Sequence, residues 1–164
     1  MTQTVWAHLP NAKHIDWVLA SLKAHPKKWA AAWNAARNAA RGEARYAAWY
    51  AAKNAAYVAG RHTAFDAAFD AVRSATRDAA KAAAKAAAWD AAKAAAWDAA
   101  YYAAWDAAHD TATDAIAALF AYDDCAYMIE SEVGELKIIA AFGDQRAILL
   151  LPACIVYNET KELA

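Results

Sequence analysis

Residues 89–116 read WDAAKAAAWDAAYYAAWDAAHDTATDAI and repeat one pattern every four residues. A large residue takes the first position, an Asp often takes the second, and Ala fills most of the other two. The same pattern extends upstream to Trp29 without an insertion, so tetrads cover residues 29–116. Ala has the highest helix propensity of all residues, and only four Gly and three Pro interrupt the 164-residue chain. The sequence therefore predicts an all-α fold.

The period of four predicts how the helices pack. A helix turns by about 100° per residue, so a stripe of period four drifts by about 40° with each tetrad and does not match a coiled coil. Over three or four tetrads, one face stays bulky and the opposite face stays rich in Ala, which lets two backbones approach closely. We therefore predict an Ala-packed helical bundle. We also predict a homo-oligomer, because a thin bundle leaves much surface for further subunits to cover.

Gly and Pro residues mark the expected helix boundaries. Gly42 and Gly60 end or kink helices, and Pro26 suits the start of one. A helix from residue 62 to residue 120 would be nearly 90 Å long, at about 1.5 Å per residue, so we expect it to bend or break around Ser74–Asp78. The expected helices span residues 12–24, 27–41, 43–59 and 62–120.

The chain is expected to form a single helical domain, residues 1–164, whose last third differs in composition from the repeat. The predicted parts are an N-terminal helix region (1–28), the tetrad-repeat helices (29–116) and aliphatic C-terminal helices (117–164). Ser131 or Glu132 can begin a helix that runs through GELKIIAAF and ends at Gly143, and Asp144 can cap a helix that begins QRAILLL. This pattern predicts an aliphatic helical hairpin that supplies the main core. The alternative for VGELKIIAAF is a short strand.

Charge is distributed unevenly along the chain, although its net value is only −1. Residues 1–61 carry nine Lys and Arg against two acids, residues 62–114 carry five against eight, and residues 115–164 carry three against eight. Such a chain can pair its basic part with its acidic part, within a subunit or between subunits, or it can present the basic part to an anion. The lack of excess positive charge argues against binding to long duplex nucleic acid.

Several classes of function are not expected from the sequence. It has no nucleotide-loop, hydrolase or metalloprotease motif, so we expect no catalysis and no cofactor. His109, with Asp106, Asp110 and Asp114, is the best candidate metal cluster, but an exposed acidic stripe explains it equally well and we expect no metal. The two Cys residues fit a reducing compartment, and the longest apolar run, residues 148–156, is too short for a bilayer. With no signal peptide recognised, we expect a cytoplasmic protein without membrane contact.

Basic and aromatic residues interleave between residues 29 and 62. Arg makes bidentate contacts to phosphate, and aromatic rings stack on bases, so this stretch predicts binding of a nucleotide or another phosphorylated small molecule. The alternative is that these cations pair with the Asp residues of 66–114 while the rings fill the core. The candidate ligand-binding residues are Arg37, Arg41, Arg45, Tyr46, Trp49, Lys53, Arg61 and His62.

The tetrads, joined to a tail that reads AYDDCAYMIES and then GELKIIAAFGDQRAILLLPA, resemble uncharacterised Ala-rich proteins of tailed bacteriophages and of some bacteria. The resemblance carries no catalytic motif. It implies a small phage accessory protein in the host cytoplasm, of a kind that often binds host factors or blunts host defences. The resulting hypothesis is a protein that sequesters a nucleotide immune signal. The alternatives are a helical inhibitor of a host protein and a structural phage protein.

Overall fold

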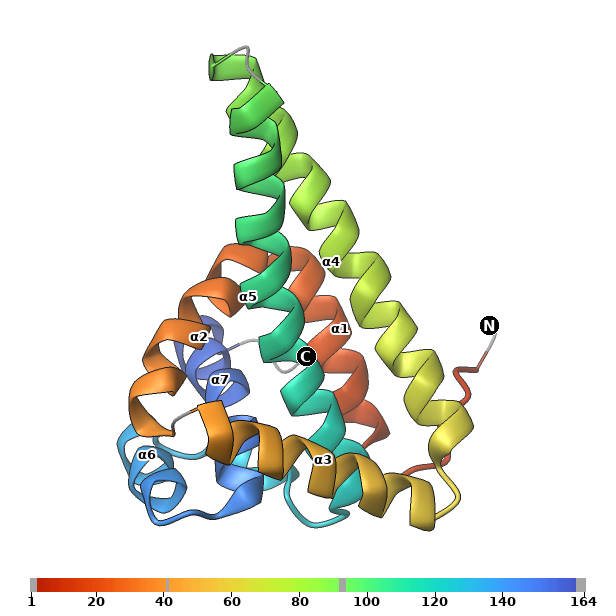
Figure 1. Cartoon of the computed structure of the whole chain (residues 1–164). Coiled ribbons are helices and arrows are strands. Elements are labelled where there is room, and N and C mark those ends of the chain that lie inside the picture. The colour runs from red at the N-terminus through yellow and green to blue at the C-terminus, as the bar shows by residue number, and fades with distance from the viewer. Residues whose placement is uncertain (1–2, 41, 92–93, 162–164) are drawn as a thin grey trace.

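The structure is a computed structural model that describes residues 3–40, 42–91 and 94–161 (Figure 1). Within these ranges it contains seven α-helices, one short 3₁₀ helix and no strand, which confirms the all-α prediction and shows that the strand alternative for residues 133–142 is wrong. None of the described helices combines the length and the hydropathy needed to cross a bilayer. The elements are α1 (Ala12–Ala24), α2 (Pro26–Ala39), α3 (Gly42–Val58), α4 (His62–Ala91), α5 (Ala94–Ala121), η1 (Ala126–Glu130), α6 (Val133–Ala141) and α7 (Gln145–Thr160).

The first three helices have nearly the predicted boundaries because local chemistry sets them. Pro26 occupies the first turn of α2, where its missing N–H costs nothing. Beyond the C-terminus of α3, Gly60 adopts a left-handed backbone conformation with φ of 76°, which glycine tolerates best. The N–H of Arg61 then donates back to the carbonyl of Ala56 at 2.9 Å, which closes the end of α3.

The segment 62–120 is broken into two helices, as expected, but the predicted position of the break near Ser74–Asp78 is wrong. Residues through Ser74–Asp78 remain helical, and the hydroxyl of Thr76, itself fully buried, donates to the Val72 carbonyl at 2.6 Å. The chain instead reverses between Ala91 and Ala94, and α4 and α5 lie side by side as a long hairpin (Figure 1). The hairpin buries Ala faces, including Ala80 and Ala84, that a straight rod would leave in water.

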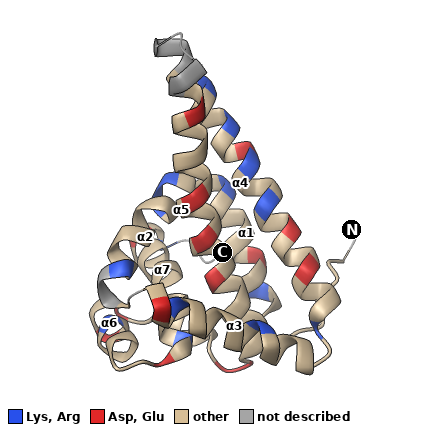
Figure 2. Ribbon diagram, in the orientation of Figure 1, with Lys and Arg blue, Asp and Glu red and all other residues tan. Residues whose placement is uncertain are grey.

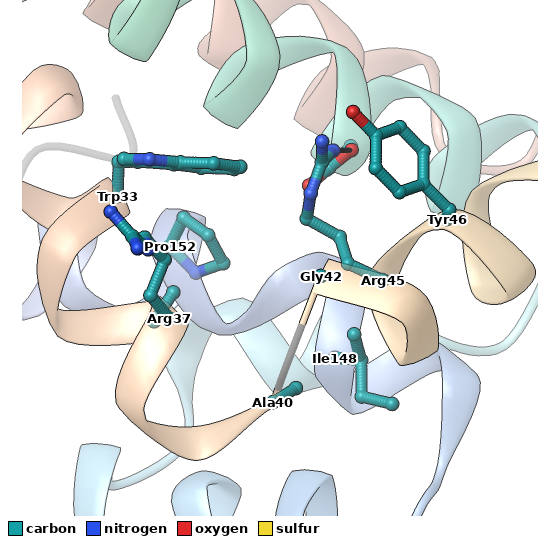
Figure 3. Close-up of a pocket in the computed structure, with 10 residues that line it drawn as sticks. Trp33, Arg37, Ala40, Gly42, Arg45, Tyr46, Ile148 and Pro152 are labelled. Atoms are coloured by element: carbon teal, nitrogen blue, oxygen red, sulfur yellow. Dashed lines mark hydrogen bonds and ion pairs between the residues drawn. The ribbon is translucent and has the colours of Figure 1, made fainter.

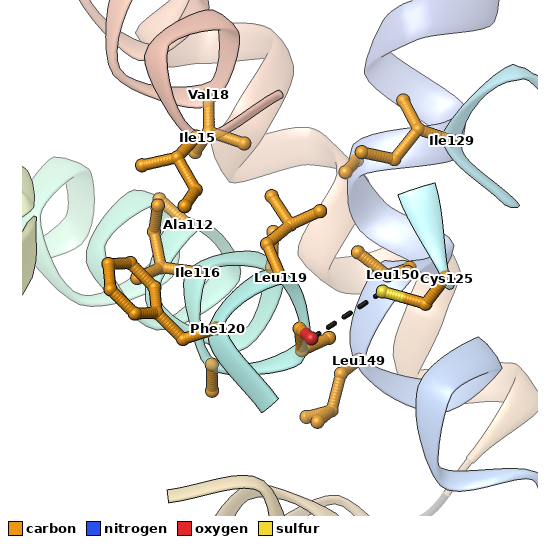
Figure 4. Packing of buried hydrophobic residues seen from close by; sticks show 14 of the residues in the cluster. Ile15, Val18, Ala112, Ile116, Leu119, Phe120, Cys125, Ile129, Leu149 and Leu150 are labelled. Atoms are coloured by element: carbon orange, nitrogen blue, oxygen red, sulfur yellow. Dashed lines mark hydrogen bonds between the residues drawn. The ribbon is translucent and has the colours of Figure 1, made fainter. Parts of the chain in front are cut away.

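The main core lies where α7 packs against α5, α2 and α3. Ten consecutive residues of α7, from Ala147 to Val156, are buried, as the aliphatic composition of the tail predicts. Figure 4 shows leucines of α7 beside Ile116, Leu119 and Phe120 of α5, with residues of α1 closing the cluster. The hairpin of α6 and α7 is held by the predicted cap: the Ala147 N–H donates to the Asp144 carboxylate at 3.1 Å.

Substituting Ala52 with Leu tests the close approach of α3 to its neighbours. Ala52 lies with Ala48 and Ala56 on one face of α3, and all three are 0% exposed, so three added carbons have no space. We expect the free energy of unfolding to fall by about 1–3 kcal/mol, measured by urea denaturation. The matched control is Ala47→Leu, at an exposed position of the same helix, which should change it by less than about 0.5 kcal/mol. Equal stability of the two variants would contradict a tight Ala contact.

Candidate functional site

A cavity of about 360 Å³, a size typical of small-molecule pockets, is lined by cationic and aromatic groups (Figure 3). The second half of α2 and the first turn of α3 form two of its walls, α7 contributes the floor, and one carboxylate comes from α5. The lining residues are Trp33, Ala36, Arg37, Ala40, Gly42, Arg45, Tyr46, Asp114, Ile148 and Pro152.

Arg45 contacts charged and aromatic side chains around the cavity. One of its terminal nitrogens donates to both carboxylate oxygens of Asp114, at 2.9 and 3.1 Å, and the other lies 3.8 Å from Asp110. The guanidinium carbon is 4.5 Å from the centroid of the Trp33 ring and 4.7 Å from that of Tyr46, which are cation–π distances. The Nε–H of Arg45 is buried and has no acceptor within the described part of the chain. Arg45 is therefore fixed among a carboxylate and two aromatic rings.

Asp114 is buried because the tetrad pattern drifts around α5. Asp98, Asp106, Asp110 and Asp114 all take the second tetrad position, yet the first two are exposed, Asp110 is 42% exposed and Asp114 is 1% exposed. Each tetrad turns the stripe by about 40°, so successive Asp residues rotate from water towards the core. Burial raises the pKa of the Asp114 carboxyl, because loss of water penalises its charged form, and the neighbouring Arg45 guanidinium acts against that rise.

Other groups make the cavity suitable for an anion. Arg37 is exposed in the last turn of α2 and has no carboxylate within 4.0 Å among the described residues. Gly42 and Arg45 belong to the first turn of α3, where backbone N–H groups have no partner inside the helix and the helix dipole is positive. The carbonyl end of α2 lies nearby, and Arg37 offsets its negative dipole.

The floor of the cavity is apolar but contains an interrupted helix. Pro152 lies inside α7 and has no N–H, so the carbonyl of Ile148 lacks the hydrogen bond that a helix normally gives it. Both residues line the cavity, with Pro152 next to Arg37 and Trp33 in Figure 3. The floor is thus apolar, except for the Ile148 carbonyl, which receives no hydrogen bond from residue 152.

The structure brings together half of the predicted ligand-binding residues. Arg37, Arg45 and Tyr46 line the main cavity, and Arg45, Tyr46 and Trp49 line an adjoining one of about 160 Å³. Arg41 lies outside the described residues. The ammonium of Lys53 lies one turn further along α3, 5.4 Å from the centroid of the Trp49 ring.

Arg61 and His62 lie beyond the opposite end of α3 and belong to another set of contacts. Arg61 donates to the Asp123 carboxylate at 2.6 and 3.2 Å and to the Phe120 carbonyl at 2.8 Å. These hydrogen bonds lower the pKa of Asp123. The His62 ring packs 5.9 Å from that of Tyr57. Arg61 therefore ties the end of α3 to the end of α5, His62 packs against α3, and neither lines the cavity.

The predicted ligand-binding residues did not include Trp33, Ile148 or Pro152. Asp114 was expected only in the alternative that pairs the cations with the Asp residues of 66–114, which the Arg45–Asp114 contact matches. Trp33 had a usable signal, because it precedes Arg37 by one tetrad and so lies on nearly the same helix face. Asp114 is 69 residues from Arg45, and Ile148 and Pro152 lie further away still, so no local pattern connects them.

Among the described residues, no group of three His, Cys, Asp or Glu side chains is placed to hold a metal ion. Burial raises the pKa of Cys125 to about 12 and that of Cys154 to about 11, which disfavours the reactive thiolates.

Comparison of the chain with protein-family models finds no match, and comparisons with curated proteins and with solved structures find none either.

Proposed function

We propose that this protein binds a phosphorylated small molecule, such as a nucleotide, in the cavity between α2, α3 and α7. The observation that carries the proposal is the grouping of two arginines, two aromatic rings and the start of a 17-residue helix around about 360 Å³. A phosphate is recognised by Arg37 together with the free N–H groups of the first turn of α3. A planar base packs on the exposed face of Trp33 or Tyr46.

Arg45 acts in this scheme as a positioning residue. Its guanidinium is already engaged by the Asp114 and Asp110 carboxyl groups, so it contributes less to attracting an anion than Arg37 does. Its contacts with Trp33 and Tyr46 instead fix the two rings before a ligand arrives, which reduces the entropy lost on binding. The ligand is held without chemical change, which is the behaviour expected of a protein that sequesters a signal.

The biological setting is a further part of the proposal. A phage-type accessory protein that removes a nucleotide immune signal from the host cytoplasm fits a cavity of this chemistry, but the setting follows only from the sequence resemblance. The homo-oligomer also stays a prediction. The two alternatives, a helical inhibitor of a host protein and a structural phage protein, would not require a ligand in this cavity.

Thermal unfolding against mononucleotides, linear dinucleotides and cyclic dinucleotides tests the proposal. A ligand present at about 100 times its Kd should add about 2.7 kcal/mol to the free energy of unfolding and raise the melting temperature. Arg37→Gln should weaken the same ligand by about tenfold or more, because a charge-assisted hydrogen bond is lost. The control is Lys13→Gln, an exposed cation on α1, which should bind normally. The proposal fails if no compound stabilises the wild type at millimolar concentration, or if Arg37→Gln binds as tightly as Lys13→Gln.

A further inference from the structure

The outer half of the α4–α5 hairpin extends beyond the other helices and carries a row of cations (Figure 1). This basic stripe consists of Arg73, Arg77, Lys81 and Lys85, which are spaced by four residues on α4 and are all exposed. Like charges at this spacing repel one another along a helix. Across the described ranges, none of the four has a carboxylate within 4.0 Å. The repulsion is therefore not relieved by an ion pair within the described chain.

A second stripe, opposite in character, runs along α5. This aromatic–acidic stripe consists of Asp98, Tyr102 and Asp106, which are spaced by four residues on α5 and are all exposed. The Tyr102 ring is 60% exposed between the two carboxylates, whereas Trp97 and Tyr101, stacked at 5.1 Å, are half-buried towards the groove side of α5. Figure 2 shows red segments along α5 and mostly blue segments along the outer half of α4, where Asp78 is the one acid in the sequence between the first and last cations of the basic stripe. The hairpin thus displays cations on one helix and their preferred partners, carboxylates and aromatic faces, on the other.

Both stripes lie on the same side of the hairpin. Its other side forms a groove of about 760 Å³ with the junction of α1 and α2, lined by alanines that include Ala83 of α4 and Ala103 of α5. Lys81 is two residues from Ala83, and Tyr102 is two residues from Ala100 and from Ala104, which also line the groove. Two residues correspond to about 200° around a helix, so both stripes face away from the groove. They form one continuous surface of two helices.

We propose that a second copy of this chain docks on this surface, with the basic stripe of each subunit over the aromatic–acidic stripe of the other. A two-fold axis along the hairpin places α4 of one subunit on α5 of its partner and repeats the same contact on the other side. The chemistry favours a second copy because each stripe is complementary to the other stripe of the same chain. Both repeat every four residues, a rise of about 6 Å, so the cations stay aligned with the carboxylates and the ring over successive turns.

The contact is expected to be weak and to stop at two subunits. The stripes drift around their helices, so only about three tetrads of each face the partner at once. Two helices in contact over about 20 Å bury less than the roughly 800 Å² per subunit of a standard interface. Cation–π contacts and exposed ion pairs supply the specificity, and added salt weakens them. Dimerisation should therefore depend on both protein concentration and salt.

Sedimentation of the full-length chain between about 5 and about 500 µM is the test. The wild type should pass from the mass of one chain towards that of two. Arg77→Glu with Lys81→Glu, and Asp98→Lys with Asp106→Lys, should each stay monomeric, because each variant meets its own copy with like charges. An equimolar mixture of the two variants should recover the two-chain species, because their stripes complement each other again.

Controls separate this surface from general charge effects. Lys13→Glu with Lys137→Glu changes the net charge by as much as Arg77→Glu with Lys81→Glu does, at exposed positions off the hairpin, and should dimerise like the wild type. If a reversed variant loses helicity by circular dichroism, Lys81→Ala with Lys85→Ala takes its place, and should weaken association by about tenfold while preserving helix propensity. The proposal is overturned if the wild type stays monomeric at the highest concentration, if folded stripe variants associate like the wild type, or if the mixture stays monomeric.

Discussion

Replacing Arg45 with Ala is expected to lower the free energy of unfolding by about 3–5 kcal/mol, measured by chemical denaturation at neutral pH. The variant removes both hydrogen bonds to Asp114 and leaves a carboxyl of 1% exposure without its counter-charge. It also removes the group that packs between the Trp33 and Tyr46 rings. The loss of both hydrogen bonds by the buried carboxyl is the larger of these two costs, because an unsatisfied buried polar group loses more than a ring contact does.

The control for this variant is Asp110→Asn, which removes the other carboxylate near Arg45. Asp110 is 42% exposed and 3.8 Å from the guanidinium, so water screens the interaction and the expected loss is below about 1 kcal/mol. If Arg45→Ala costs no more than Asp110→Asn, then the buried pair does not contribute to stability as described.

The stability deficit of Arg45→Ala should also depend on pH. Burial already raises the pKa of Asp114, and removing the guanidinium raises it further. The folded variant then retains a proton that the unfolded chain loses at lower pH. Stability from that proton is present in acid and is lost as pH rises through the folded-state pKa. Because the wild-type carboxyl itself has a pKa of about 8, both folded proteins keep the proton at lower pH. The deficit relative to the wild type should therefore be nearly constant up to about pH 8 and should grow above it.

Replacing Phe120 with Ala should cost a similar amount, about 3–5 kcal/mol, by creating a cavity in the main core. Phe120 is 0% exposed, and its ring meets that of Phe65 edge to face at a centroid distance of 5.5 Å. The loss removes contacts between α4 and α5 at the base of the hairpin. Urea unfolding followed by circular dichroism provides the measurement.

Phe142→Ala is the matched control, because this side chain is 89% exposed at the end of α6. Its loss should change the free energy of unfolding by less than about 0.5 kcal/mol. If the two Phe substitutions lower the free energy of unfolding by similar amounts, then burial in the core does not determine how much each side chain stabilises the protein.

The parts of the fold that were predictable from sequence are those with local causes. Pro26 and Gly60 act within one turn of the chain, and the Asp144 cap involves residues three positions apart. The reversal between α4 and α5 was missed because residues 91–94 contain neither Gly nor Pro. Its cause is non-local. The sequence pattern is helical on both sides of the reversal, and a hairpin is more stable than one straight helix because the two Ala faces bury each other.

The candidate site was only partly predictable for the same reason. The tetrads correctly placed Arg37, Arg45 and Tyr46 near one another, because they occupy adjacent turns around Gly42. The pattern could not distinguish Asp114 from Asp98 or Asp106, because all three share a tetrad position. Only the packing of α5 against the core determines which of them is buried, and so which one meets Arg45.

Isothermal titration of the most stabilising nucleotide into three proteins tests the central proposal most directly. The three are the wild type, Arg37→Gln at the cavity and Lys81→Gln on the exposed basic stripe. We predict one nucleotide per chain, an affinity about tenfold or more lower for Arg37→Gln, and an unchanged affinity for Lys81→Gln. Binding that is lost in Lys81→Gln but retained in Arg37→Gln would contradict the proposal, because it would place the anion on the hairpin rather than in the cavity beside Arg45.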